Sequence, residues 1–334
     1  MARRVTMSDV ARAAGVSLMT VSRVLNNKGD VSAATRQRVQ DVICQLGYRP
    51  SSVARSLVTS RTRTVGLVVP DNANPFFSEL ARGVEHTAYA SGYSVFLCNT
   101  EENADREKAV LQTLEDKRVD GVILCSSRLA QPELRAAIAG FPAAVLVNRE
   151  LDGDGIDTIL VDDELGARLA TGHLLERGRR RIGFLSGPEL SWSSAQRVKG
   201  YEAAFAAANV AHSASWLLPC APTVEGGRAA TRELLQRHPG LTALLCYNDL
   251  VAVGAIQGCT DLHLSVPASV CVFGFDDIAL AALVTPPLTT CRVSRYDLGC
   301  EAMRSLLARF DPSANTAPRR VVVHPELVIR ASAP

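Results

Sequence analysis

The stretch GVSLMTVSRVLN, residues 15–26, is expected to form a short helix after a turn. Two large apolar side chains, Leu18 and Met19, lie on the face of this helix that should be exposed to water. On a helix that follows the glycine, one face holds Val21, Val24 and Leu25. The opposite face holds Leu18, Met19, Ser22 and Arg23. Large apolar side chains on this outer face suggest that they contact a binding partner rather than water. The alternative is that Leu18 and Met19 pack against a neighbouring helix.

The spacing of Ala11, Gly15 and Val21 indicates what positions this helix. A small residue lets two helices approach, and a glycine makes the turn between them because it reaches left-handed backbone angles without strain. An apolar residue then locks the second helix. This spacing suits a helix-turn-helix, whose DNA-binding form places the second helix in the major groove. A generic helical hairpin can share the same spacing.

Capping residues predict three helices in this N-terminal head. Thr6 and Ser17 are candidate N-caps of the first two helices, and the third is expected to run from a Ser32 cap to Gly47. The residues of the third helix that are expected to turn inward are Val39, Val42, Ile43 and Leu46.

The head is strongly basic although the whole chain has a formal net charge of only +2. Residues 1–63 contain eleven Arg and Lys and three Asp, whereas the remaining 271 residues contain 25 basic and 31 acidic side chains. A basic head on a mildly acidic body suggests that the head binds a polyanion. A solvated basic face is the alternative.

Composition narrows the class of protein. The chain has 334 residues, enough for two or three domains, and its 47% hydrophobic and 21% charged residues are typical of globular proteins. No uncharged apolar run approaches the roughly 18–20 residues of a membrane helix, and the basic start lacks the apolar segment of a secretory signal. We therefore expect a cytoplasmic protein. Nine cysteines without a CxxC pair predict buried, reduced thiols.

From Thr64 onward, short apolar runs alternate with amphipathic helical stretches. Runs of this length that are rich in Val, Ile and Leu are typical of parallel strands buried on both faces. The expected strands are 64–70, 93–99, 120–125, 143–148, 158–161, 181–187, 241–249 and 270–277. The expected helices between them include 78–90, 104–117, 163–176, 197–208 and 226–237. There are too many βαβ units for one sheet, so we expect two doubly wound lobes. Neither a Rossmann GxGxxG motif nor a P-loop is present.

The sequence resembles that of a known protein family. The head, VTMSDVARAAGVSLMTVSRVLNNKGDVSAATRQRV, and later segments such as RTRTVGLVVPDNANPFFSELARGVE, HLLERGRRRIGFLSGP and VFGFDDIALAALVTPPLTT closely resemble the lactose repressor/galactose repressor (LacI/GalR) family over nearly the whole chain. The resemblance implies an α/β fold with a helix-turn-helix head and two lobes of the periplasmic-binding-protein type. It implies a dimer whose operator binding is controlled by a small ligand in the cleft.

The resemblance also implies domain boundaries. Residues 1–49 form the DNA-binding head, 50–63 the hinge helix and linker, and 64–334 the effector-binding and dimerisation domain. The first lobe is expected to comprise about 64–162 and 294–320. The second lobe is expected to comprise about 163–291 and 321–334.

By the same resemblance, Leu18 and Met19 are the residues that read bases in the major groove, and Arg23 adds base contacts. Thr20, Ser22 and Asn26 are expected to hold phosphates. The full set of expected DNA-binding residues also includes Thr6, Ser17 and Tyr48. In the hinge helix, the family drives a leucine into the minor groove, and the matching residues here are Leu57, with Ala54 and Arg55 beside it. The lysine that some members place next is Val58 here.

The body also resembles periplasmic ribose-binding proteins at the residues that contact the sugar. The matching residues are Asn74, Phe76, Phe77, Asn148, Arg149, Arg197, Asn248 and Asp276. Aromatic faces stack on a sugar ring, Asp and Asn are expected to accept from hydroxyls, and Arg donates to them. An aromatic often found near Pro222 is absent, and Val293 replaces a usual glutamine, which argues against strict ribose recognition. The arginine pair leaves a sugar acid possible.

An enzyme and a stand-alone sugar-binding protein are the two alternatives to a DNA-binding regulator. An enzyme is possible on this architecture, but the sequence has no nucleophile elbow, metal-ligand spacing or catalytic carboxylate pair. His173 and Glu176 lie one helical turn apart without an HExxH motif and are expected on the surface. A stand-alone sugar-binding protein would lack the basic head. The sequence therefore predicts a DNA-binding transcriptional regulator, a repressor, with no cofactor and no metal. Its expected partners are a pseudo-palindromic operator, a sugar or sugar-acid effector and a second copy of the chain.

Overall fold

The computed structural model divides the chain into two compact units, Met1–Thr62 and Arg63–Pro334. It describes residues 5–26, 29–48, 61–153, 155–311 and 317–334. The expected hinge helix lies outside these described residues, and so do Ala54, Arg55, Leu57 and Val58.

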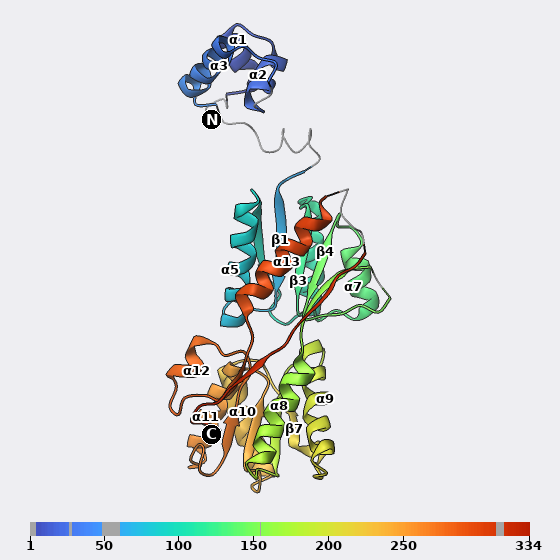
Figure 1. Ribbon diagram of the computed structural model, residues 1–334, viewed down its shortest axis with the longest axis vertical. Coiled ribbons are helices and arrows are strands. Elements are labelled where there is room, and N and C mark those ends of the chain that lie inside the picture. Colours follow the sequence, from blue (N-terminus) through green and yellow to red (C-terminus); the bar gives the residue numbers. More distant parts are fainter. Residues whose placement is uncertain (1–4, 27–28, 49–60, 154, 312–316) are drawn as a thin grey trace. The chain divides into compact units, whose positions relative to one another are not determined.

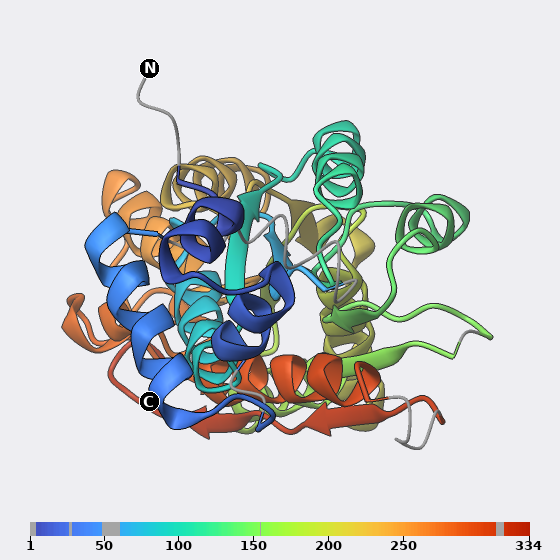
Figure 2. The same ribbon diagram turned by 90° about the horizontal axis from the view of Figure 1, so that it is seen from above.

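Three helices surround a small apolar core in the first unit (Figure 2): α1 (Met7–Ala14), α2 (Leu18–Leu25) and α3 (Ala33–Leu46). The buried members of this core are Val10, Ala11, Ala14, Val21, Val24 and Val39. Gly15 ends α1 with a left-handed φ of +64°, and its N–H donates to the Ala11 and Arg12 carbonyl oxygens. These observations confirm the spacing that predicted a helix-turn-helix. One expectation was wrong, because Leu46, the last residue of α3, is exposed rather than turned inward.

The second unit begins with a lobe built on a six-stranded parallel sheet (Figure 1). The strand order is β11-β5-β4-β3-β1-β2. The strands are β1 (Thr64–Val69), β2 (Ser94–Asn99), β3 (Gly121–Cys125), β4 (Ala144–Val147), β5 (Asp157–Val161) and β11 (Arg320–Val323). The helices of this lobe are α5 (Pro75–Ala90), α6 (Ala104–Asp116), α7 (Gln131–Ile138) and α13 (Arg295–Arg309).

Alternate residues of these strands enter two separate cores. Val65, Leu67 and Ile123 pack with residues of α5 and α13 on one face of the sheet. Val68 and Val122 pack with residues of α6 and α7 on the other face. Because side chains alternate across a strand, burial on both faces requires nearly continuous apolar runs. The first lobe is therefore doubly wound, as the sequence predicted.

The second lobe repeats this design with a four-stranded parallel sheet in the order β7-β6-β8-β9. Its strands are β6 (Ile182–Ser186), β7 (Leu217–Pro219), β8 (Ala243–Cys246) and β9 (Cys271–Phe273). Its helices are α8 (Asp163–Glu176), α9 (Trp192–Ala207), α10 (Val224–Arg237), α11 (Asp249–Asp261) and the short α12 (Ala279–Leu283). Phe184 packs on the side of α8 and α9, whereas Leu185 packs on the side of α10 and α11. The sequence did not predict β7, which has only three residues.

The last segment of the chain corrects the expected lobe boundary. We expected the chain to enter the second lobe at residue 321, but β11 pairs in parallel with β5 and so belongs to the first lobe through Val323. The chain then continues into β12 (Glu326–Val328), which pairs antiparallel with β10 (Thr290–Arg292) (Figure 1). The chain therefore passes from the first lobe to the second between β11 and β12.

The C-terminal residues are buried in the second lobe. The Ser332 hydroxyl donates to the Val272 carbonyl oxygen at 2.6 Å. The His173 Nε2 lies 3.1 Å from the Ala333 carbonyl oxygen. His173 is consequently half-buried, and the expectation that it lies on the surface was wrong.

The cysteines are all free, as predicted, but three of them are not buried. Cys44 is exposed, and Cys98 and Cys220 are half-buried. Among the residues described, no helix combines the length and the apolar character that crossing a membrane requires.

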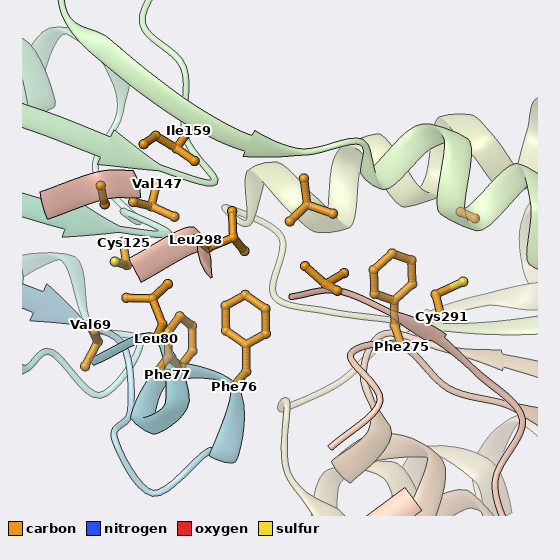
Figure 3. Packing of buried hydrophobic residues seen from close by; sticks show 14 of the residues in the cluster. Val69, Phe76, Phe77, Leu80, Cys125, Val147, Ile159, Phe275, Cys291 and Leu298 are labelled. Carbon is orange, nitrogen blue, oxygen red and sulfur yellow. The ribbon is translucent and has the colours of Figure 1, made fainter. Parts of the chain in front are cut away.

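One continuous apolar cluster includes side chains of both lobes. Figure 3 shows Phe76, Phe77 and Leu80 of α5 in this cluster, together with Phe275 and Cys291 of the second lobe. Within it, α5 and α13 pack backbone to backbone at glycines. A Cβ at Gly83 would lie 2.1 Å from the Tyr296 carbonyl oxygen, and a Cβ at Gly299 would lie 2.0 Å from the Leu80 carbonyl oxygen.

This packing predicts a loss of stability in Gly83→Ala. The added methyl group meets a main-chain oxygen that cannot move away cheaply, so the free energy of unfolding should fall by about 1–3 kcal/mol. Gly172→Ala is the matched control, because Gly172 lies inside α8 with nothing within 4 Å of its Cβ position. That variant should gain up to about 1 kcal/mol. Urea unfolding measures both, and equal stability of Gly83→Ala and the native chain would contradict the close packing.

Candidate functional site

Ser17 fixes the start of α2. Its Oγ accepts a hydrogen bond from the Thr20 main-chain N–H at 3.1 Å and lies 2.9 Å from the Thr20 Oγ1. An N-cap of this kind satisfies a main-chain donor that the helix itself leaves unpaired. The first turn of α2, which carries Leu18 and Met19, is therefore held in one orientation.

The outer face of α2 is apolar and exposed. Leu18 is 48% exposed and Met19 is 65% exposed, and Arg23 is exposed on the same helix. Neither apolar side chain belongs to the core of the head. The alternative, in which this pair packs against a neighbouring helix of the head, is therefore wrong.

Several of the expected DNA-binding side chains also hold the head together. Thr6 and Asp9 form a capping box, in which the Thr6 hydroxyl donates to Asp9 Oδ2 at 2.7 Å. The Asn26 Nδ2 donates to the Ser22 carbonyl oxygen at 2.9 Å at the end of α2. Tyr48 is half-buried against the core of the head.

In the second unit, seven of the eight expected effector residues line one cavity of about 30 Å³ between the lobes. The first lobe supplies Asn74, Phe76, Phe77 and Asn148, and the second supplies Arg197, Asn248 and Asp276. Most of these residues follow the carboxyl ends of parallel strands or begin the next helix, where open α/β sheets bind their ligands. The Phe76 and Phe77 rings meet edge to face with centroids 5.1 Å apart.

The side-chain oxygens of the three asparagines in the cavity each accept one main-chain hydrogen bond. The Oδ1 atoms of Asn74, Asn148 and Asn248 accept from the main-chain N–H groups of Phe76, Val161 and Val251 at 3.0, 3.1 and 2.8 Å. A main-chain N–H cannot reverse its role, so each amide is fixed with its NH₂ group turned away from that bond. The amide hydrogens that remain are the donors that these residues can offer, and the Asn248 Nδ2 already donates to the Pro222 carbonyl oxygen at 3.4 Å.

Arg197 is already paired. Its Nε donates to Asp163 Oδ1 at 2.8 Å, and another nitrogen donates to the Tyr247 carbonyl oxygen. The guanidinium carbon lies 3.6 Å from the centre of the Phe275 ring. Both members of the ion pair are buried, so the arginine charge is largely neutralised before a ligand arrives.

Asp276 is the buried acid of the cavity. Burial raises the pKa of its carboxyl to about 7, although the charges of Arg197 and Arg295 act to lower it. Its main-chain φ is +110°, a strained value for a residue with a side chain. Among the described residues its carboxylate has no hydrogen-bond partner, which leaves it available to a ligand hydroxyl.

Sequence reasoning missed four polar residues of the cavity: Glu102, Ser126, Ser193 and Tyr247. Glu102 follows β2 and Ser126 follows β3, and both have left-handed φ values of +58° and +51°. The rule that ligands bind at the carboxyl ends of strands could have found them. Glu102 is held by the buried Arg128, whose Nε donates to its Oε2 at 2.6 Å.

Arg149 is the expected effector residue that does not line the cavity. Its Nη2 instead donates to the Leu129 carbonyl oxygen at 2.7 Å. The preceding Asn148 has a left-handed φ of +51°. Val293, which stands in place of the glutamine usual in ribose binders, is buried in the apolar cluster and offers no side-chain hydrogen bond.

A larger groove of about 670 Å³ opens from the cavity. It shares Asn74, Phe77, Glu102 and Pro222 with the cavity. The rest of its lining combines three acidic residues, Asp71, Glu101 and Glu189, with Pro188 and the segment Pro219–Ala221 and Thr223 of the second lobe. Within the described residues, no group of three His, Cys, Asp or Glu side chains is placed to hold a metal ion.

Both units match family models. Residues 6–51 match the family described as bacterial regulatory proteins of the lacI family, and residues 62–331 match the periplasmic binding proteins and sugar binding domain of the LacI family. The chain belongs to the LacI family. Members of the LacI family are DNA-binding transcriptional regulators with a small-molecule-binding domain, and this chain is one of them rather than an enzyme.

Individual LacI-family proteins match over the full length. The chain is 36% identical over 333 residues to the HTH-type transcriptional repressor PurR of Aliivibrio salmonicida, with 98% of each chain covered. It is 38% identical over 330 residues to the ribose operon repressor of Escherichia coli, with 98% of this chain and 99% of that protein covered. The structure of the Lac repressor dimer bound to operator and the anti-inducer ONPF matches with a TM-score of 0.87 at 28% identity, covering 99% of each chain.

The raised pKa of Asp276 predicts how stability depends on pH. An unfolded aspartate loses its proton near pH 4, whereas the folded Asp276 keeps it to about pH 7. Between these values the folded state binds the extra proton, so the free energy of unfolding should fall as the pH rises, by up to about 1.4 kcal/mol per pH unit. Asp276→Asn removes this contribution, and urea unfolding at pH 4 to 8 should show a shallower decline.

Asp277→Asn is the control with the opposite sign. Burial alone would raise the pKa of Asp277, but hydrogen bonds from Arg292 and Arg330 lower it overall. The native carboxylate therefore stabilises the fold above its ordinary pKa. The Asn variant should be less stable than the native chain at pH 7, and the difference should vanish in acid. Parallel pH profiles for the native chain and Asp276→Asn would refute the assignment of the buried acid.

Proposed function

We propose that this LacI-family regulator is a repressor that binds a pseudo-palindromic operator as a homodimer and is controlled by an uncharged polyol in the cavity between its lobes. The observation that carries the proposal is that seven expected effector residues from distant segments line one cavity. A protein that works on an operator acts where the DNA is, so we place it in the cytoplasm.

The exposed face of α2 supports the role in DNA binding. An apolar pair that is held rigidly outward by the Ser17 cap is suited to thymine methyl groups, and Arg23 on the same helix can donate to guanine. The net positive charge of the head supplies the sequence-independent attraction to phosphates. Leu18, Met19 and Arg23 are therefore the residues that we assign to base recognition.

The charges of the cavity favour an uncharged ligand over a sugar acid. Arg197 is paired with Asp163, Glu102 is paired with Arg128, and Arg149 lies elsewhere. Among the described residues Asp276 forms no salt bridge, and its ionised form, which is present from about pH 7 upward, would repel a carboxylate. A polyol suits the site because its hydroxyls accept from the asparagine NH₂ groups and donate to Asp276.

The size of the cavity suggests how the ligand controls the protein. A cavity of about 30 Å³ is too small for a sugar, although the groove of about 670 Å³ shares four lining residues with it. The lobes must therefore separate to admit the effector and then settle around it. A ligand that contacts both lobes changes the angle between them. In a dimer, this change can alter the affinity for DNA.

Exposed apolar side chains support the homodimer. Phe96 and Leu97 are exposed on β2, the edge strand of the first sheet, and Leu280 and Leu283 are exposed on α12. Exposed apolar edges and patches of this kind mark interaction surfaces. A second copy of the chain is the partner that we propose for them.

Replacing Arg23 tests the DNA-binding face. Selection from a random DNA library identifies the operator, and Arg23→Ala should then lose about 1–3 kcal/mol of discrimination at one base pair of each half-site. Arg12→Ala is the control, because Arg12 is an exposed residue of α1 rather than α2. It should weaken all sequences alike. If Arg23→Ala also weakened specific and random DNA equally, the base-reading role would be withdrawn.

A ligand screen tests the cavity. Thermal shifts with pentoses, hexoses, disaccharides and sugar acids should identify an uncharged sugar, and Asp276→Ala should abolish its shift because ligand hydroxyls are then buried without a partner. Arg149→Gln is the matched control and should keep the native shift. Stabilisation by sugar acids alone, or an effect of Arg149→Gln as large as that of Asp276→Ala, would contradict the proposed effector site.

A further inference from the structure

Arg295 joins the two lobes at the effector site. It is the first residue of α13, which packs on α5 in the first lobe. Its Nη1 donates to the main-chain oxygen of Asp276, which belongs to the second lobe. The effector residues Phe76 and Phe77 lie at the start of α5, so one rigid pair of helices carries both their rings and the arginine.

The Asp276 turn depends on donors from other segments. Its φ of +110° lies in a region that residues with side chains rarely adopt, and Asp277 follows with a φ of +55°. The Asp276 N–H donates to the Cys291 carbonyl oxygen at 2.8 Å, and its carbonyl oxygen accepts from Arg295. Such strain persists only when surrounding groups hold the backbone in place.

Arg295 retains a donor beyond this bond. Its Nε is buried and has no hydrogen-bond partner among the described residues. A guanidinium in this position acts as a fixed cation beside the Asp276 turn.

We propose that Arg295 is a positioning residue. It holds the strained main-chain turn at Asp276 so that the Asp276 carboxyl faces the cavity, and it links this turn to the helices of the first lobe. This role rests on the effector site proposed above. It gives α13 a direct electrostatic link to the occupancy of the site.

The charges around Asp276 make the proposal measurable. Among the charged groups around the Asp276 carboxyl, Arg197 on α9 has the largest electrostatic effect on its pKa. The other titratable groups that interact with it electrostatically are Asp163 on α8, Asp249 on α11 and Cys291 on β10. Arg295 adds a cation that lowers the pKa of the Asp276 carboxyl, acting against burial. Removing this cation should raise the pKa further.

The test is a titration of Asp276 in the full-length chain by carboxyl-carbon NMR, with Asp276→Asn to identify the signal. In Arg295→Gln the midpoint should move up by about one pH unit, and Arg295→Lys should restore it in large part. Arg292→Gln is the matched control, because Arg292 is three residues away but pairs with Asp277. It should leave the midpoint where it is.

An unchanged midpoint in folded Arg295→Gln, or an equal rise in the Arg292 control, would overturn the proposal. If Arg295→Gln does not fold, Arg295→Met keeps the apolar stem and is read in the same way. A residue that merely stabilised the fold would alter the unfolding midpoint without moving the titration. The measurement needs neither operator nor effector, so its failure is distinct from a failure of the ligand screen.

Discussion

A single buried ion pair organises the cleft wall of the second lobe. The guanidinium of Arg197 on α9 binds Asp163 at the start of α8, donates to the carbonyl oxygen of Tyr247 after β8 and stacks on Phe275 after β9. Four elements from separate parts of the chain therefore meet on one side chain. Burying two charges costs several kcal/mol per ion, and this cost is offset only while the pair stays together. The wall is consequently held in one geometry.

The asparagines of the cavity combine folding with binding. Each uses its side-chain oxygen to satisfy a main-chain N–H: at the start of α5 for Asn74, at the end of β5 for Asn148 and at the start of α11 for Asn248. The same bond directs the NH₂ group. Specificity at this site is thus a by-product of helix and strand ends, which cannot shift without unfolding part of a lobe.

The sequence predicted most of the fold because strands that are buried on both faces must be continuously apolar. It predicted seven cavity residues because the resemblance to ribose-binding proteins agreed with their position after strands. It failed where a hydrogen-bonding or pairing partner decides the outcome. Arg149 donates to the Leu129 carbonyl oxygen instead of lining the cavity, and no pattern of side chains in the sequence indicates that partner. Residues 321–323 are apolar enough for either sheet, and only the pairing of β11 with β5 assigns them to the first.

The small size of the cavity has a consequence for how tightly any ligand is held. A closed form with a cavity this small has to open before a sugar enters, so the observed affinity is the intrinsic affinity reduced by the fraction of molecules that are open. A substitution remote from the cavity that weakened the closed form would therefore tighten binding without touching the ligand. The sensitivity of this regulator to its effector is set by the resting equilibrium between its lobes as much as by the residues that contact the ligand.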